Sequence, residues 1–265
     1  KGSRPCRVVL MNDSGRPLVS AVAVVPCFNE ARRLDPERFL SLTRAGVTVL
    51  FVDDGSTDKT PEVIEVALTK HAELTSLSLP ENRGKGESVR LGMLHAIDGG
   101  AEVVGFIDAD LAAPPEEFLR LFDHLLRSPR TRVVTGARVG LMGMSVKRSM
   151  PRHYLSRVFA TFAALMLRQQ FYDTQCGIKM FKVDNRLCEV LSTPFDTRWI
   201  FDVELLNRLF SYSEENQSDA DPGIKEVPLE KWHEVPESKL TIRSMTKASI
   251  DLLRLEVLQR RSKSR

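Results

Sequence analysis

The chain lacks the cysteine spacings that mark disulfide scaffolds and metal fingers. Its 265 residues include four cysteines, and no two of them form a Cys-x-x-Cys pair. Small secreted domains and zinc modules depend on such patterns. We therefore expect a reduced, cytoplasmic protein that folds around an apolar core, and hydrophobic residues make up an ordinary 42% of the chain.

Long apolar runs and a large excess of one charge are missing too. The longest apolar-rich run, residues 158–167, is far shorter than the ~20 residues that span a bilayer. No signal peptide is recognisable. Residues 1–3 resemble a cloning remnant, so the sequence leaves open whether a membrane anchor precedes them in the native protein. The 38 Lys and Arg residues nearly balance the 35 Asp and Glu residues, which argues against nucleic acid as a partner.

Basic charge gathers instead near the C-terminal end. Residues 243–265 hold seven basic and two acidic residues, and Ile250, Leu253 and Val257 fall on one helical stripe. We predict a basic amphipathic helix over 243–265. Two roles stay open for it: contact with an anionic membrane surface at the cytosolic face, or a solvated charged face.

Short β-branched runs alternate with helix-like segments in the first half of the chain. Strands are expected at 21–25, 47–52, 74–79, 103–107 and 133–135, and helices at 61–70, 86–97 and 115–127. This alternation predicts an α/β fold with a mostly parallel, Rossmann-like sheet flanked by helices. The second half predicts helices at 154–167 and 201–212, a loop and short strand at 173–181, and an edge strand at 224–229.

Polar side chains follow each of the five expected strands of the first half. These clusters lie at 26–30, 53–58, 81–86, 108–110 and 136–138. In a parallel sheet they share one edge, where open α/β sheets bind ligands. Asp108 and Asp110 suit Mg²⁺, which needs one or two protein carboxylates when a diphosphate supplies further oxygens. The structural alternative is a helix-capping Asp beside a solvated one.

Two common nucleotide-binding motifs are absent. The segment Gly84-Lys85-Gly86 lacks the Ser or Thr that follows the lysine of a P-loop. A Gly-x-Gly-x-x-Gly fingerprint is missing after the first strand, where Pro26 and Phe28 stand. P-loop ATPases and typical NAD enzymes are therefore excluded, which leaves a nucleotide site built from carboxylates, a metal ion and Arg or Lys.

These motifs resemble the inverting glycosyltransferase family 2, whose members have the GT-A fold. The resemblance rests on VVPCFNE, VDDGSTD, NRGKG and DAD at 24–30, 52–58, 82–86 and 108–110. In the second half, the segments at 173–181, 198–206 and 232–240 resemble the polyprenyl-phosphate branch, the dolichyl-phosphate β-glucosyltransferases. The resemblance covers roughly residues 20–256. It implies a tail at 1–18 and one domain at 19–242, with a nucleotide-sugar half at 19–140 and an acceptor half at 141–242.

The resemblance places the donor in the first half. The residues implied to bind it are Pro26, Phe28, Glu30, Asp53, Asp54, Arg83, Lys85 and Asp108. Asp53 would hydrogen-bond the base, uracil in a UDP-sugar. Structural roles stay open for Glu30 and Asp54 as helix caps, and for Arg83 and Lys85 in a solvated turn.

Asp110 and Asp108 are the expected metal ligands. Mg²⁺ or Mn²⁺ bound there would act as a Lewis acid on the departing diphosphate. Close relatives often carry a polar residue two positions after the second Asp, but this chain has Ala112. The metal would then be held by Asp110, the diphosphate and water.

The catalytic candidates are Asp202, Arg138 and Glu204. A hydroxyl acceptor needs a carboxylate base, whereas a phosphate acceptor is already nucleophilic at neutral pH. Asp202 stands where many family members carry the base, so it is the first candidate; an interior orienting role is equally open, and Glu204 comes second. Arg138 resembles an arginine that meets the acceptor phosphate, a contact suited to its guanidinium fork; an ion pair is the alternative.

Five further positions of the second half have weaker assignments. Asp173, Gln175 and Lys179 are expected to shape the sugar pocket, while Cys176 packs. His233 has either a structural role or a position over the bound donor. The apolar run 158–167 is expected in the core or as a floor for a lipid tail.

We therefore predict a metal-dependent inverting glycosyltransferase that moves a hexose, expected to be glucose, from a UDP-sugar to polyprenyl or dolichyl phosphate. Transfer to a soluble or secondary-metabolite acceptor is the alternative, and a non-catalytic nucleotide-sugar binding module is a third. GDP-mannose as donor stays open. A sugar-1-phosphate nucleotidyltransferase would need a glycine-rich loop after the first strand, which VVPCFNE does not provide.

Overall fold

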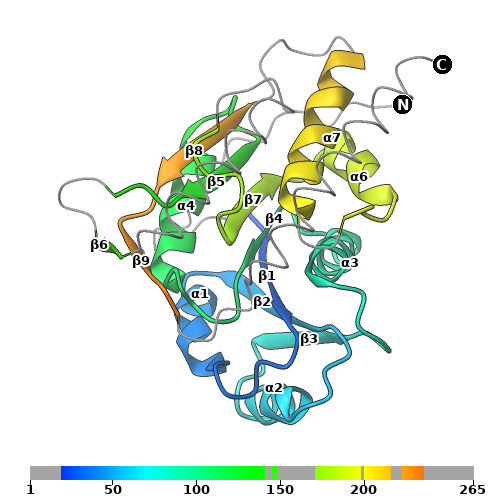
Figure 1. The fold of residues 1–265 in the computed structure, drawn as a ribbon, viewed down its shortest axis with the longest axis vertical. Coiled ribbons are helices and arrows are strands. Elements are labelled where there is room, and N and C mark those ends of the chain that lie inside the picture. Colours follow the sequence, from blue (N-terminus) through cyan, green and yellow to red (C-terminus); the bar gives the residue numbers. More distant parts are fainter. Residues whose placement is uncertain (1–18, 141–144, 148–170, 198–199, 216–222, 236–265) are drawn as a thin grey trace.

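A seven-stranded sheet forms the centre of the computed structural model, which describes residues 19–140, 145–147, 171–197, 200–215 and 223–235 (Figure 1). The strand order is β3-β2-β1-β4-β7-β5-β8. The strands are β1 (Ala21–Cys27), β2 (Val47–Asp53), β3 (Leu74–Ser78), β4 (Val103–Ile107), β5 (Val133–Ala137), β7 (Ile178–Lys182) and β8 (Ile224–Pro228). β6 (Ser145–Lys147) and β9 (Lys231–His233) form a separate parallel pair.

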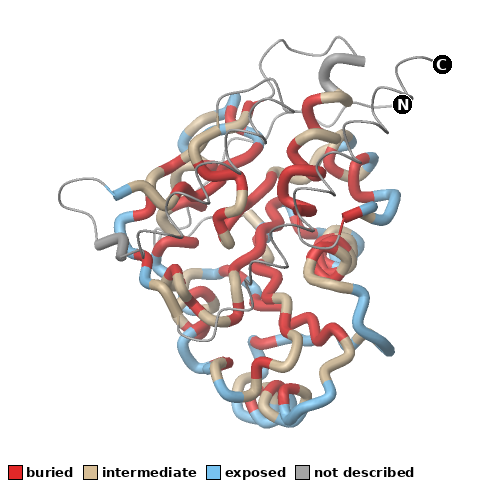
Figure 2. Tube along the Cα trace, in the orientation of Figure 1, coloured by how far each residue is buried: buried red, intermediate tan, exposed pale blue. Residues whose placement is uncertain are grey.

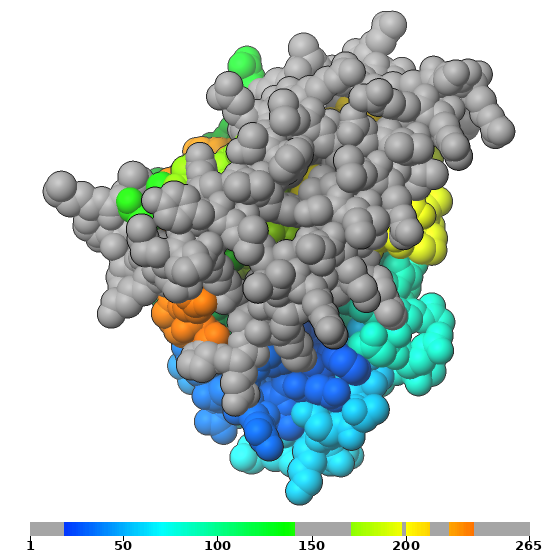
Figure 3. Space-filling view, in the orientation of Figure 1, coloured from blue at the N-terminus to red at the C-terminus, as the bar shows by residue number. Residues whose placement is uncertain are grey.

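Helices cover both faces of this sheet (Figure 1). One face carries η1 (Pro36–Phe39), α1 (Leu40–Arg44), α2 (Thr60–Lys70) and α4 (Pro115–Arg127). The other face carries α3 (Lys85–Asp98), α6 (Asn185–Ser192) and α7 (Phe201–Glu215). Helix α6 lies against α3, and in the space-filling view its yellow surface adjoins the blue-green surface of α3 (Figure 3). Between the two helices Arg90 donates a hydrogen bond of 2.7 Å to the Leu191 carbonyl.

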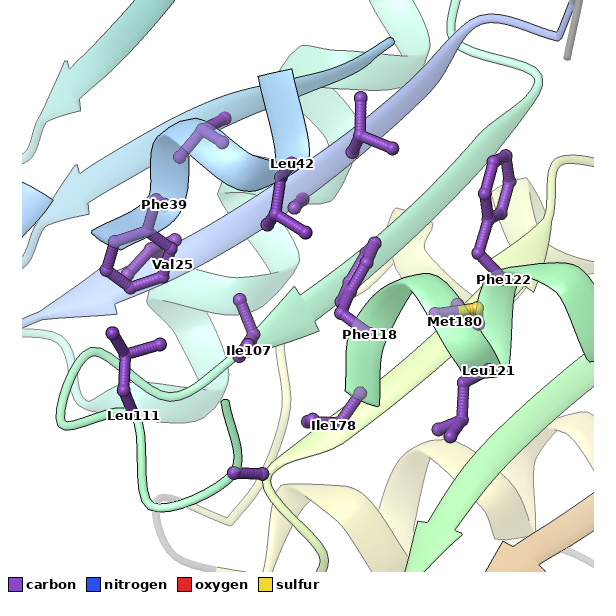
Figure 4. Close-up of a cluster of buried hydrophobic side chains, with 14 of the residues drawn as sticks. Val25, Phe39, Leu42, Ile107, Leu111, Phe118, Leu121, Phe122, Ile178 and Met180 are labelled. Atoms are coloured by element: carbon purple, nitrogen blue, oxygen red, sulfur yellow. The ribbon is translucent and has the colours of Figure 1, made fainter. Parts of the chain in front are cut away.

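Alternation along β1 divides the core into two clusters. Val25 belongs to the cluster under α1 and α4, with Phe39 and Phe118 (Figure 4). Its neighbour Val24 belongs to the cluster under α3 and α7, with Met93. The central strands are buried on both faces (Figure 2), as expected where helices cover a parallel sheet.

The predicted fold class is confirmed, as are the main elements of the first half. The strands expected at 74–79 and 224–229 form the two edges of the sheet, as β3 and β8. The antiparallel strand β7, inserted between β4 and β5, was not predicted in that position. The helices η1, α1 and α6 were not predicted either. No helix among the described residues is long and apolar enough to cross a membrane.

Three predicted segments lie outside the described residues. They are the tail at 1–18, the helix at 154–167 with its apolar run, and the basic helix at 243–265. The division into a donor half and an acceptor half remains a prediction.

Candidate active site

The predicted polar clusters meet at the carboxyl edge of the parallel strands. The loops that follow β1, β2 and β4 lie there because β2 and β4 both pair in parallel with β1. The antiparallel strand β7 starts at the same edge, since Ile178 pairs with Ile107 at the end of β4. Lys85 opens α3 and lies close to Asp108, so the helix also begins at this edge.

The loops after β1 and β2 are joined by hydrogen bonds around Asn29. Its backbone has a φ of +52°, a left-handed conformation that Asn tolerates better than most residues. The Asn29 side-chain oxygen accepts from the Thr57 and Asp58 amides at 2.8 and 3.3 Å. Its own amide donates to Ser56 Oγ at 3.0 Å. The loops expected around the nucleoside thus support one another.

Adjacent carboxylates at the end of β2 have different surroundings. Asp53 Oδ1 accepts from the Ser56 amide at 3.2 Å. Asp54 is buried, and its oxygens accept from the Arg83 and Gly84 amides, both at 2.8 Å, and from Asn82 Nδ2 at 3.0 Å. Asp54 therefore holds the loop before α3 and caps no helix; direct contact with a donor stays a prediction for both residues.

Glu30 pairs with an arginine that was not singled out from the sequence. Arg33 Nε and Nη2 donate to the two Glu30 carboxylate oxygens at 2.8 and 2.7 Å. Arg33 Nη1 also lies 4.0 Å from Asp110 Oδ2. The Glu30 carboxylate thus directs a guanidinium towards the pair formed by Asp108 and Asp110. The sequence signal for this ion pair was the i, i+3 spacing of Glu30 and Arg33.

The other donor-binding candidates lie at the same edge. Pro26 and Phe28 are partly exposed, as contact with a ligand requires. The Arg83 guanidinium lies 3.7 Å from Glu81, and its side chain is half exposed. Their contact with a nucleotide stays a prediction.

Asp108 and Asp110 stand on a tight turn after β4. The Asp108 amide donates to the Gly177 carbonyl at 3.2 Å, and the Ala112 amide donates to Asp110 Oδ1 at 3.1 Å. Burial and the neighbouring charge of Asp108 raise the pKa of the Asp110 carboxyl above its ordinary value. The two carboxylates therefore repel each other in a place where water screens them poorly.

This pair fits a metal ion that also binds a diphosphate. Asp108 Oδ1 is buried and accepts no hydrogen bond from the described residues, although Lys85 Nζ lies 2.5 Å away in an ion pair. No group of three or more His, Cys, Asp or Glu side chains within the described ranges could hold a metal. A cation bound by Asp110 and Asp108 would therefore need oxygens from a substrate or water.

Gly177 keeps space open for the Asp108 carboxylate. A Cβ atom at this position would collide with Asp108 Oδ2. Gly177→Ala should therefore displace the carboxylate and lower kcat/KM for glycosyl transfer roughly 100-fold, the cost of misplacing a functional group by about 1 Å. A kinetic assay with circular dichroism tests this. Gly140→Ala, where a Cβ meets no atom of the described residues within 4 Å, should leave turnover unchanged. Equal effects of the two substitutions would contradict the assignment.

Asp202 forms a buried ion pair with Lys179. Lys179 Nζ donates to Asp202 Oδ1 and to the Cys176 carbonyl, both at 2.7 Å. Lys179 has no exposed surface and Asp202 has 5%. Lys179 is thus buried and ties β7 to the start of α7. Its part in shaping the sugar pocket stays a prediction, and burial limits it to an indirect one. The pairing favours the orienting role for Asp202.

Glu204 does not fit the role of a catalytic base. Its carboxylate accepts from the Asp196 and Thr197 amides, both at 3.0 Å, and from Thr197 Oγ1 at 2.8 Å. Arg208 Nη2 donates to it at 2.6 Å, and the residue is 1% exposed. These contacts leave it no access to a substrate, so Glu204 instead fixes the loop before α7.

Arg138 is held by Asp173 in a bidentate ion pair. Nε and Nη2 donate to the two Asp173 oxygens at 2.6 and 2.7 Å, and the ring of Trp232 lies 5.7 Å from the guanidinium carbon. Burial lowers the pKa of Arg138, but the charge of Asp173 outweighs it and raises the pKa. The amides of Tyr172 and Asp173 donate to Glu226 at 2.8 and 2.9 Å.

This network adds specific contacts to the residues predicted in the second half. Asp173 supports Arg138, and the Gln175 carbonyl accepts from Arg138 Nη2 at 3.1 Å. Burial raises the pKa of the Cys176 thiol to about 12, so this residue stays protonated and packs. The amide of His233, an exposed residue, donates to the Ala112 carbonyl at 2.9 Å and ties β9 to the Asp110 turn.

The mostly parallel sheet, with paired carboxylates and facing cations at its open edge, has the architecture of the GT-A fold. The chain belongs to glycosyl transferase family 2, whose model matches residues 22–210. The protein is therefore a glycosyltransferase.

Relatives with curated names match most of the chain. Dolichyl-phosphate beta-glucosyltransferase ALG5C of Trichomonas vaginalis is 31% identical over 88% of this chain and 70% of its own length. The Saccharomyces cerevisiae dolichyl-phosphate beta-glucosyltransferase is 31% identical over 83% of this chain and 68% of its own length. The Drosophila melanogaster enzyme of the same name is 33% identical over 85% of this chain and 70% of its own length.

A solved structure shares the fold. The mannosyltransferase PcManGT from Pyrobaculum calidifontis, in complex with GDP-Man and Mn²⁺, aligns with a TM-score of 0.50 and 22% identity. The alignment covers 87% of this chain and 61% of that one, so the present chain spans less than two thirds of the mannosyltransferase.

Proposed function

We propose that this glycosyltransferase moves glucose from a UDP-sugar to dolichyl phosphate or another polyprenyl phosphate, with Mg²⁺ or Mn²⁺ at Asp110 and Asp108. The names of the relatives support the acceptor and the sugar. The observation that carries the donor assignment is the carboxylate pair facing Lys85 at the open edge of the sheet.

The donor side combines carboxylates with two cations. Asp53 would hydrogen-bond the base, while Lys85 and Arg33 would compensate charge on the diphosphate. A bound metal ion would supply Lewis-acid stabilisation of the leaving diphosphate. Asp110 and Asp108 would hold that ion, because each offers carboxylate oxygen beside the place where α3 begins.

The acceptor side suits a phosphate better than a hydroxyl group. A phosphate needs no base at neutral pH. The two carboxylates that were candidates for a base have other partners: Asp202 is paired with Lys179, and Glu204 is enclosed. Arg138 uses Nε and Nη2 for Asp173 and Gln175, while Nη1 makes no hydrogen bond with any described residue. That nitrogen could donate to a phosphate without loss of the ion pair.

A membrane-embedded acceptor implies contact with a lipid surface. The basic residues at 243–265 would supply it by attraction to anionic lipids, worth about 1 kcal/mol for each Lys or Arg near the surface. We propose peripheral binding at the cytosolic face on this ground.

The test is release of UDP from UDP-glucose with Mg²⁺ or Mn²⁺, with and without a short-chain polyprenyl phosphate. We expect metal-dependent release that the lipid phosphate stimulates, together with a glucosylated lipid product. Slow UDP release at a rate that the lipid phosphate does not change would contradict the proposed acceptor, while the assignment as a glycosyltransferase would stand. Release from GDP-mannose alone would contradict the donor, and release from neither would contradict both.

A further inference from the structure

Lys85 occupies a position in direct contact with the expected metal site. It is the first residue of α3 and follows Gly84, whose φ of +93° turns the chain into the helix. Lys85 Nζ lies 2.5 Å from Asp108 Oδ1 and 6.0 Å from the centre of the Phe201 ring. Asp108 Oδ1 is buried, and its ion pair with Lys85 is the contact that a divalent cation bound there would have to displace.

A second cation faces the carboxylate pair less closely than Lys85. Arg33 also faces the carboxylate pair, but at 4.0 Å and with Glu30 as its bidentate partner. Among the described residues, Lys85 is therefore the cation in closest contact with the pair.

We propose that Lys85 is an internal counter-ion that keeps a divalent metal off the carboxylate pair until a diphosphate arrives. This inference rests on the proposed function. A metal ion alone must separate Lys85 from Asp108 and then lie beside its positive charge, which opposes binding. A diphosphate offers the ammonium a new partner at the start of α3, a position that favours anions.

Binding of metal and of diphosphate is therefore coupled through one side chain. Because coupling is reciprocal, the metal must raise the affinity for the diphosphate by the same factor. Such couplings typically amount to about 5- to 150-fold. The wild-type protein should thus bind metal weakly alone and tightly with a nucleoside diphosphate, which limits occupation of the site without a donor.

Binding of Mn²⁺ with and without UDP, followed by the electron paramagnetic resonance signal of free Mn²⁺, tests this without catalysis. We expect UDP to tighten Mn²⁺ binding to the wild type by at least about tenfold. In Lys85→Met, Mn²⁺ alone should bind about tenfold more tightly than to the wild type, and the gain from UDP should shrink. Lys85→Gln is the second variant if Lys85→Met does not fold, as judged by circular dichroism.

Lys70→Met is the matched control, because it removes one positive charge from an exposed position at the end of α2. It should leave both affinities unchanged. If Lys85 variants bind Mn²⁺ alone no more tightly than the wild type, while UDP still promotes binding, the counter-ion role is wrong and the proposed function stands. If the wild type binds no Mn²⁺ even with UDP, the metal-dependent function fails, and this inference with it.

Discussion

Asp110→Asn is expected to lower glycosyl transfer roughly 1,000-fold while the protein stays folded. The Asn side chain has nearly the same shape, and its oxygen can still accept from the Ala112 amide, a bond of 3.1 Å in the structure. The turn after β4 should therefore persist. What is lost is the charge that holds the metal against the diphosphate, and removing one such stabilising group typically costs 10²–10³ in rate.

The comparison is made by measuring kcat for UDP release and the thermal unfolding midpoint of the same samples. Asp98→Asn is the control, since it removes the same charge from an exposed residue at the end of α3. A normal rate in Asp110→Asn, or an equal loss in Asp98→Asn, would show that Asp110 does not hold the metal.

The second large effect concerns stability. Lys179→Met and Asp202→Leu should each lower the free energy of unfolding by about 3–5 kcal/mol, because each leaves a buried charge without its partner. The two side chains are joined by a hydrogen bond of 2.7 Å, and they are 0% and 8% exposed. The double variant should recover most of the loss, since an apolar pair leaves no charge behind.

Guanidinium-induced unfolding of the two single variants and the double variant measures these differences. Arg127→Met is the matched control. The ion pair of Arg127 with Asp123 has the same 2.7 Å length, but the Arg127 side chain is 75% exposed and the Asp123 side chain 45%. A surface pair of this kind is worth about 0–1 kcal/mol. If the buried variants cost no more than the control, the Lys179–Asp202 pair does not hold β7 to α7.

Most of the parallel half of the fold could be predicted from local patterns. Apolar runs of strand length and the helical spacing in 115–127 depend on residues close in sequence, and the structure places both as expected. β7 was different, because the direction and neighbours of a strand depend on pairing with distant residues. Its lysine at position 179 gave no local sign of a buried ion pair.

The residues of the candidate site could be predicted where a polar motif directly follows a strand, and less well elsewhere. Asp108 and Lys85 were both singled out from the sequence, but their contact depends on how α3 is placed against β4. Glu226 was missed because its function is to accept hydrogen bonds from the amides at 172 and 173, which no side-chain pattern records. Glu204 was misjudged because its partners come from a loop earlier in the chain.

The insertion of β7 between β4 and β5 has a consequence for how the chain assembles during synthesis. β4 and β5 are consecutive strands of the first half, yet each pairs with β7 and not with the other. β1 to β4 can pair as soon as residue 107 has left the ribosome. β5 is complete at residue 137, but the strand that joins it to them ends at Lys182. A nascent chain therefore carries β5 as an apolar strand without its partner β7 while the 45 residues from 138 to 182 are translated. In this interval a chaperone would protect it from aggregation.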